Sequence, residues 1–380
     1  MASVTQPRGR SRTAPTSETS EPEKIFARAA LALYPMTTAR YGTPMTAQIF
    51  DNLLDLSRLP WFDVHNDRLV VSDASVGPVI DMHSHIALAY LLPMRVDLYR
   101  ATPQTEHYLP SCCSIDFEVY QNKNFTPAAL SALKRDLTLG SLSRGGMRAT
   151  HTVPNLVREM DELGIVHSVL LPIELPYISN NAAHALDAAR REPKVLSFGS
   201  VHPIVDRVGT RLDEQAHGGA RGVKVHPAVQ LIMPDHPRAM ALYRQCAERN
   251  LPVIWHCGPV GIELQSGRRR SQVALYEKPI AEQPRTTFVL GHAGALQMEQ
   301  ALDLACRYPN VWLELSGQSL SNVRTIFDRA DPERVVYGSD WPFYHQAIGI
   351  AKVLLATGGR EHLRTKVLHQ NAARLLGLAT

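Results

Sequence analysis

Two histidines separated by one residue stand where a buried strand is expected to end. His83 and His85 close the largely apolar run PVIDMHSH. At positions i and i+2 of a strand, both side chains point to the same side. Because imidazole nitrogen is a common ligand of zinc and similar ions, this pair can bind one metal ion together.

Four other apolar runs also end in residues that can bind a metal or move a proton. His256 lies at the end of PVIWHC, His292 at the end of TTFVLGH, Asp340 at the end of RVVYGSD, and Lys224 and His226 lie in RGVKVHP. A single histidine in such a place is typical of a hydrogen-bonded core or surface side chain. Several such residues at different strand ends are stronger evidence than one, because the carboxyl ends of barrel strands meet at one face. Together these residues predict a metal site there.

The elements that must position these residues are eight short runs rich in Val, Ile and Leu. Each run precedes an amphipathic stretch with helix-capping residues, which is the pattern of strands alternating with helices. The runs are PVIDMHSH, IVHSVLLP, KVLSFGSV, RGVKVHP, PVIWHC, TTFVLGH, VWLELSG and RVVYGSD. They predict a fold of the α/β class, a (β/α)8 TIM barrel over residues 78–380.

Two segments depart from this alternation. Residues 86–151 separate the first strand from its helix, which starts near Thr152, whereas a usual βα loop has about 2 to 6 residues. Loops of this kind lie on the catalytic face of a barrel, so we expect a lid. Residues 25–77 contain two stretches with helical spacing, IFARAALALY and TAQIFDNLLDLSRL, and predict a helical N-terminal extension. Residues 1–24 carry almost nothing to bury and predict a disordered tail.

Composition limits the kind of protein. The chain has 380 residues, of which 44% are hydrophobic, enough to bury a full core. A formal charge of +4 is too small at this size for a nucleic-acid surface. Five cysteines without regular spacing are typical of reduced thiols, and no apolar run approaches the roughly 18 residues that span a bilayer. We expect a cytoplasmic protein that binds a small-molecule substrate and neither nucleic acid nor membrane; the sequence leaves a homo-oligomer open.

Six motifs resemble those of one enzyme superfamily. They are IDMHSHI (80–86), GVKVHP (222–227), VIWHCGP (253–259), VLGHAG (289–294), YGSDWPF (337–343) and NAARLLGL (371–378). They are similar to the amidohydrolase superfamily, in the amidohydrolase-related branch that includes aminocarboxymuconate-semialdehyde decarboxylase. The resemblance covers about residues 78–380. It implies that His83, His85, His256 and Asp340 bind a divalent metal, with Zn²⁺ as the expected ion. It makes His292 a catalytic histidine in the one-metal form or a ligand in the two-metal form.

Three further residues have two interpretations or a weak signal. In two-metal amidohydrolases a lysine at the end of the fourth strand is carboxylated and bridges the ions, and GVKVHP resembles that motif, although the decarboxylase branch usually lacks it. The alternative is that Lys224 is a free amine that binds an anionic substrate or pairs with a carboxylate. Arg269, in the run Arg268 to Arg270, can bind a substrate carboxylate, although such a run is also typical of a solvated loop. His226 is a second candidate for substrate binding.

The expected activity is metal-dependent hydrolysis of an amide, lactone or other ester-like bond of a small molecule. The ion lowers the pKa of a water, Asp340 accepts its proton, and His292 stabilises the developing oxyanion or shares the proton transfer. The alternative is non-oxidative decarboxylation of a small carboxylic acid at the same site. A catalytically silent barrel would be expected to lack a ligand, and none is missing.

Overall fold

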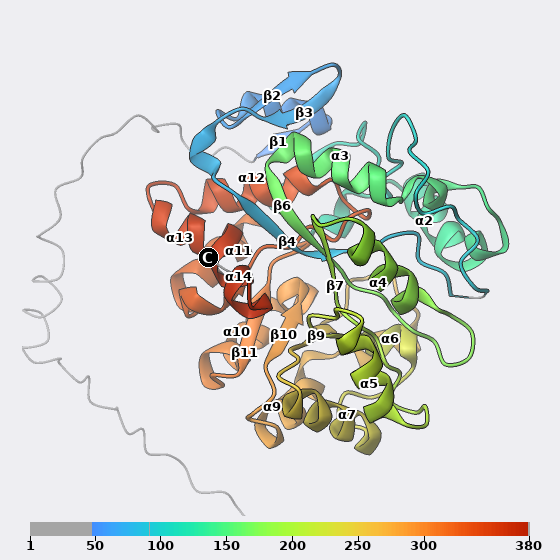
Figure 1. Ribbon diagram of the computed structural model, residues 1–380. Helices are drawn as coiled ribbons and strands as arrows, with labels where there is room; N and C mark the ends of the chain where they lie inside the picture. The colour runs from blue at the N-terminus through green and yellow to red at the C-terminus, as the bar shows by residue number, and fades with distance from the viewer. Residues whose placement is uncertain (1–47, 91, 379–380) are drawn as a thin grey trace, which may run out of the picture. The chain divides into compact units, whose positions relative to one another are not determined.

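The computed structural model describes residues 48–90 and 92–378 (Figure 1). The predicted tail over 1–24 and the predicted helix IFARAALALY lie outside the described residues.

Eight parallel strands form the centre of the structure. They are β4 (Val79–Ser84), β6 (Ile165–Leu170), β7 (Val195–Ser197), β8 (Val223–Val225), β9 (Val253–His256), β10 (Phe288–Gly291), β11 (Val311–Glu314) and β12 (Val335–Val336). β4, β6 and β7 make one sheet, and β8 to β12 make a second. Parallel bridges join the sheets at both edges, between Gly199 and Val223 and between Ser84 and Trp341. The ring is therefore closed, and each strand lies in one of the eight predicted runs.

Helices follow the strands and cover the outside of the ring (Figure 1). They are α3 (Val153–Leu163), α4 (Asn181–Arg191), α5 (Val208–His217), α6 (Pro227–Gln230), α7 (Pro237–Glu248), α8 (Gln265–Arg270), α9 (Glu277–Glu282), α10 (Met298–Arg307), α11 (Leu320–Arg329), α12 (Gln346–Ala356), α13 (Glu361–Thr365) and α14 (Asn371–Leu376). α3 shows why they form: Val153, Leu156, Met160 and Leu163 are buried on one side. Gly164, with φ 68°, ends the helix in the left-handed conformation that favours glycine.

The interior of the ring is filled by alternate strand residues. Ile80 and Met82 of β4 belong to a buried cluster with Val169, Ile254 and Val289, and α14 closes this cluster at one end. The barrel therefore has a packed apolar floor, and the polar residues lie beyond it.

The predicted helical extension is wrong for the residues that are described. The sequence TAQIFDNLLDLSRL contains a short strand, β1 (Ile49–Phe50), and a 3-10 helix, η1 (Leu53–Arg58). A hairpin of β2 (Phe62–His65) and β3 (Arg68–Val71) follows. β1 pairs with β5 (Ile115–Asp116) of the insertion, and this tertiary pairing overrides the helical spacing. Leu59 has φ −83° and ψ 143° because the residue before a proline is held extended.

The described residues of the insertion, 86–90 and 92–151, contain several short elements. These are β5, the 3-10 helices η3 (Gln121–Asn124), η4 (Gly140–Leu142) and η5 (Met147–Thr150), and helix α2 (Pro127–Leu139). Lys352 of α12 ties the insertion to the barrel: Nζ donates to Gln121 Oε1 and to the carbonyl oxygen of Gln318, both at 2.7 Å. Burial lowers the pKa of Lys352 to about 7, so a neutral amine with two N–H groups suits these two acceptors.

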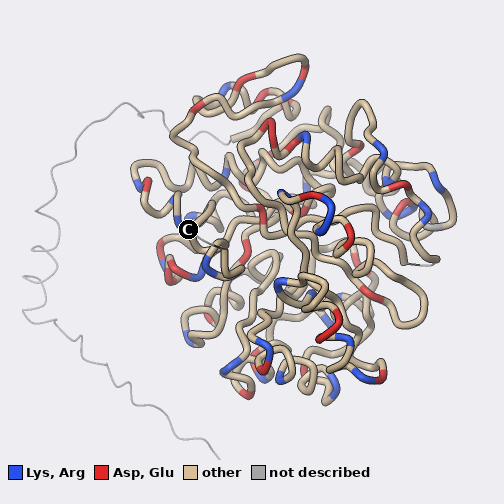
Figure 2. Tube along the Cα trace, in the orientation of Figure 1, with Lys and Arg blue, Asp and Glu red and all other residues tan. Residues whose placement is uncertain are grey.

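Charged residues of both signs are interspersed along the described chain (Figure 2). Exposed ion pairs link neighbouring helices; Arg329 of α11, for example, pairs with Glu299 and Asp303 of α10. Among residues 48–90 and 92–378, no helix is long and apolar enough to cross a membrane.

The contacts of Lys352 predict a stability effect. Lys352→Met should lower the free energy of unfolding by about 2 kcal/mol, because two buried oxygens lose their donors. The difference from the parent should grow as pH rises from about 7 towards 10. Over that range the unfolded lysine keeps its proton while the folded one has released it, so alkali favours the folded parent. Urea unfolding at several pH values measures both effects. Lys278→Met, at an exposed lysine, is the control, and an equal loss in both variants would contradict the assignment.

Candidate metal centre

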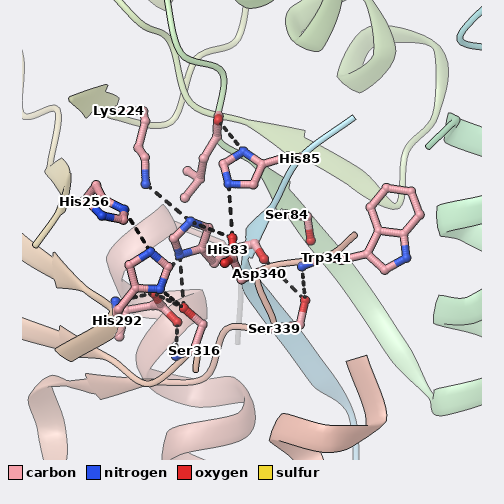
Figure 3. Close-up of polar contacts among 12 residues, drawn as sticks. His83, Ser84, His85, Lys224, His256, His292, Ser316, Ser339, Asp340 and Trp341 are labelled. Carbon is pink, nitrogen blue, oxygen red and sulfur yellow. Dashed lines mark hydrogen bonds and ion pairs between the residues drawn. The ribbon is translucent and has the colours of Figure 1, made fainter. Parts of the chain in front are cut away.

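Two histidines and an aspartate converge at the carboxyl end of the barrel (Figure 3). His83 and His85 come from the end of β4, and Asp340 follows β12. Asp340 Oδ1 lies 3.3 Å from His85 Nε2 and 3.6 Å from His83 Nε2. One ligand atom from each residue lies within 4.8 Å of the others, and all three residues are buried. The predicted pair of histidines and the predicted carboxylate are thus brought together.

Hydrogen bonds behind the two histidines decide which ring nitrogen carries the proton. His83 Nδ1 donates to Glu314 Oε2 at 2.7 Å, and His85 Nδ1 donates to the carbonyl oxygen of Leu171 at 2.8 Å. Burial lowers the pKa of His83 well below its usual range, so the ring is neutral. His83 Nε2 is then an unprotonated acceptor that faces Asp340 Oδ1. A divalent metal ion fits this donor set, because two imidazole nitrogens and a carboxylate oxygen converge within 4.8 Å of one another.

A second chain of hydrogen bonds leads to His256. Ser316 Oγ donates to Glu314 Oε2 at 2.9 Å, so its oxygen accepts from His292 Nδ1 at 2.8 Å. His292 Nε2 is then an acceptor, and His256 Nδ1 donates to it at 3.1 Å. This order leaves His256 Nε2 unprotonated, which is the state that a metal ligand requires. Both nitrogens of His292 are engaged.

His256 and its neighbour His226 form one wall of the site. Their rings are stacked, with centroids 3.9 Å apart and an interplanar angle of 8°. Burial lowers the pKa of both imidazoles well below the usual range. Both rings are therefore neutral. His256 does not belong to the cluster of three described above.

Lys224 of β8 lies beside the cluster of His83, His85 and Asp340. Its Nζ lies 3.3 Å from His83 Nε2, and the side chain is buried. Burial lowers the pKa of Lys224 to about 8. The amine therefore lies beside the cluster, where either predicted role would place it.

Glu314 of β11 links the parts of the site. In addition to His83 Nδ1 and Ser316 Oγ, its Oε2 accepts from the backbone N–H of His292 at 3.0 Å. Neither Glu314 nor Ser316 was among the residues that the sequence predicted for the site. The signal available was an acidic residue within the run VWLELSG.

Asp81, which sequence reasoning missed, positions Asp340. Its carboxylate accepts from Ser339 N at 2.9 Å, from Ser339 Oγ at 2.6 Å and from Gln346 Nε2 at 2.7 Å. Burial raises the pKa of Asp81 to about 6. The backbone N–H of Asp340 donates to His83 O at 2.8 Å, and Asp340 has φ 64°. An acid inside an otherwise apolar strand was the signal for this role.

Trp341 connects the site to helix α3. Its backbone oxygen accepts from His85 N at 2.6 Å, and its Nε1 donates to Glu159 Oε2 at 2.9 Å. Glu159 also binds His107 of the insertion at 3.0 Å. The residue that follows Asp340 is thus held from both its backbone and its side chain.

The site forms the polar end of a cavity of about 450 Å³. His83, His85, Lys224, His226, His256, His292 and Asp340 all line it. Tyr120 and other residues of the insertion line it too, so the insertion covers the catalytic face. Arg269 is exposed on α8 and is not among the lining residues, so the structure does not bring it to the site.

Comparisons with known proteins identify the family and the fold. The family model for amidohydrolase matches residues 80–378. The structure is a parallel α/β barrel with buried histidine and carboxylate groups that could hold a metal ion, and the chain belongs to the amidohydrolase family. No curated protein matches the chain.

Solved structures extend the comparison. An uncharacterized TIM-barrel protein from Bordetella bronchiseptica is 16% identical, with a TM-score of 0.55 over 79% of this chain and 98% of its own. 5-Carboxyvanillate decarboxylase from Sphingomonas paucimobilis is 15% identical, with a TM-score of 0.55 over 80% and 99%. A probable 2-pyrone-4,6-dicarboxylic acid hydrolase from Acinetobacter baumannii is 14% identical, with a TM-score of 0.48 over 79% and 99%. The first two likenesses show the barrel fold.

The role of Glu314 predicts a change in metal binding. Glu314→Gln should weaken metal affinity by about 10-fold to 100-fold, because an amide accepts poorly from three donors and makes His83 less basic. Competition with a chromogenic chelator measures the affinity. Glu299→Gln, at an exposed carboxylate on α10, is the control and should bind as the parent does. Parent affinity in Glu314→Gln would contradict the assigned role.

Proposed function

We propose that this protein hydrolyses an amide, lactone or other ester-like bond of a small molecule at a single metal ion. The observation that carries the proposal is the convergence of one carboxylate oxygen, Asp340 Oδ1, and the Nε2 atoms of His83 and His85 at the polar end of the cavity. This arrangement can hold an ion and place a proton acceptor beside it.

His83, His85 and Asp340 would hold the ion, with His256 Nε2 as the fourth ligand. When bound, the ion, which we propose is Zn²⁺, would lower the pKa of a water towards about 7 and polarise the scissile carbonyl. One ion is favoured over two. In the second cluster of ligand type, His83, His292 and Glu314, His83 Nδ1 donates to Glu314 Oε2, and both ring nitrogens of His292 are hydrogen-bonded to Ser316 and His256.

The side chains of the site have separate parts in the reaction. Asp340 accepts a proton from the attacking water and returns it to the leaving group. Lys224 Nζ is placed to donate to the oxygen on which charge develops. His292 has no free N–H for that purpose, so we assign it to orienting His256 instead of the predicted oxyanion role.

Decarboxylation of a small carboxylic acid is the second candidate. The position of Lys224 favours it, because a cation beside the ligand cluster can bind a substrate carboxylate. The fold is also that of 5-carboxyvanillate decarboxylase.

Isotope incorporation separates the two reactions. The metal-loaded protein is incubated with lactones, amides and aromatic acids, once in H₂¹⁸O and once in D₂O. Hydrolysis places one ¹⁸O atom in the acid product, whereas decarboxylation releases CO₂ and places deuterium on the carbon that carried it. Mass spectrometry reads both labels. A product that carries deuterium and no ¹⁸O would overturn hydrolysis. Equal turnover by the metal-free protein would overturn both candidates.

Asp340 is the residue whose change tests the proton transfer. Asp340→Asn should retain part of the metal affinity, since an amide oxygen can still bind an ion. It should turn over at least about 10²-fold more slowly, because an amide does not accept a proton at neutral pH. Steady-state rates at equal metal content measure the effect. Asp303→Asn, on the exposed side of α10, is the control. A near-parental rate in metal-loaded Asp340→Asn would mean that another group is the base.

A further inference from the structure

The walls of the cavity are apolar. Leucine, isoleucine and valine side chains come from the insertion, from α6 and from the segment before α8; they include Leu88, Leu133, Leu137, Val229, Ile262 and Leu264. The candidate metal ligands lie at the end formed by the strands. The cavity therefore offers one polar end and a long apolar surface, and its volume is in the range that holds a drug-sized ligand.

Two leucines continue the apolar surface to the outside. Leu231 and Leu264 line the cavity, yet they are 64% and 82% exposed. Leu231 also has φ 54°, a left-handed conformation that is strained for a leucine. Exposed leucines that line a cavity are typical of a surface that becomes covered when a ligand binds.

Two polar side chains of the walls make hydrogen bonds to the walls themselves. Asn122 donates to Val260 O at 2.9 Å and accepts from Tyr344 Oη. Glu263 Oε1 accepts from Val260 N at 3.1 Å, whereas its buried Oε2 has no hydrogen-bond partner among the described residues. Glu263 is therefore a polar point in a wall that is otherwise mainly apolar. Lys134 is exposed and can remain in water.

We infer that the substrate is an amphiphile: a single carbonyl-bearing head at the metal centre and an alkyl or aryl tail that packs on Leu231 and Leu264. This inference rests on the proposed function for the head and on the apolar walls for the tail. Each methylene that moves from water into the cavity should tighten binding by up to about fourfold.

Binding of a series of n-alkyl carboxylates, from acetate to decanoate, tests the tail without turnover. These molecules have a head that can bind the metal and no bond to hydrolyse. Isothermal titration calorimetry with the zinc-loaded full chain should give a Kd that falls steadily with chain length. In the double variant Leu231→Ser/Leu264→Ser, the ratio of the acetate Kd to the decanoate Kd should shrink by about 10-fold. Ile204→Ser, at an isoleucine that is 44% exposed and does not line the cavity, is the matched control and should keep the parental ratio.

The outcomes separate this inference from the proposed function. Equal Kd values for acetate and decanoate would overturn the amphiphile, whether or not the protein hydrolyses anything. Chain-length dependence without hydrolysis of any lactone or amide would support the tail site and overturn the proposed reaction. A second copy of the chain is the other molecule that could bury these leucines, and sedimentation of the parent and the double variant tests for it. A parental dimer that dissociates in the variant, with an unaltered Kd ratio, would assign the leucines to that contact and overturn the inference.

Discussion

The arrangement of the site depends on the buried carboxylate of Glu314. One of its oxygens accepts from the ring of His83, the hydroxyl of Ser316 and the backbone of His292. A buried carboxylate needs such donors, and each donor needs an acceptor, because neither has water to replace the other. Because each donor is paired with an acceptor, these hydrogen bonds determine which ring nitrogen carries the proton in His83, His292 and His256. His83 and His256 therefore present lone pairs to the centre.

Asp81 plays a similar part on the outer side of β4. It binds the segment after β12 through Ser339 and Gln346, and this segment carries Asp340 in a left-handed conformation. Such a conformation costs free energy in a residue with a side chain, so the surrounding hydrogen bonds must hold it. The strands supply a rigid frame, and the two buried carboxylates, Asp81 and Glu314, join the segments beyond the strand ends to that frame.

The cavity combines a polar end with apolar walls for a physical reason. Removing water from the cavity strengthens the interactions of charged groups at its end, because the local dielectric constant falls. The insertion 86–151 supplies much of that apolar wall. It is held by Lys352, which does not line the cavity. The barrel thus provides the chemistry, and the insertion provides the surroundings in which it acts.

The sequence by itself determined the eight strands and the polar residues at their ends, because strand periodicity and apolar runs are local properties. It failed at residues 48–59, where pairing of β1 with a distant strand overrides helical spacing. Only the tertiary structure decided which polar residues face inwards. Met82 and His83 both point into the barrel, because β4 has one residue more than β6 between Asp81 and Ser84. His292 turns inwards through a φ of 58°. A period of two predicts a face only while the strand is regular, and these irregularities are imposed by neighbours remote in sequence.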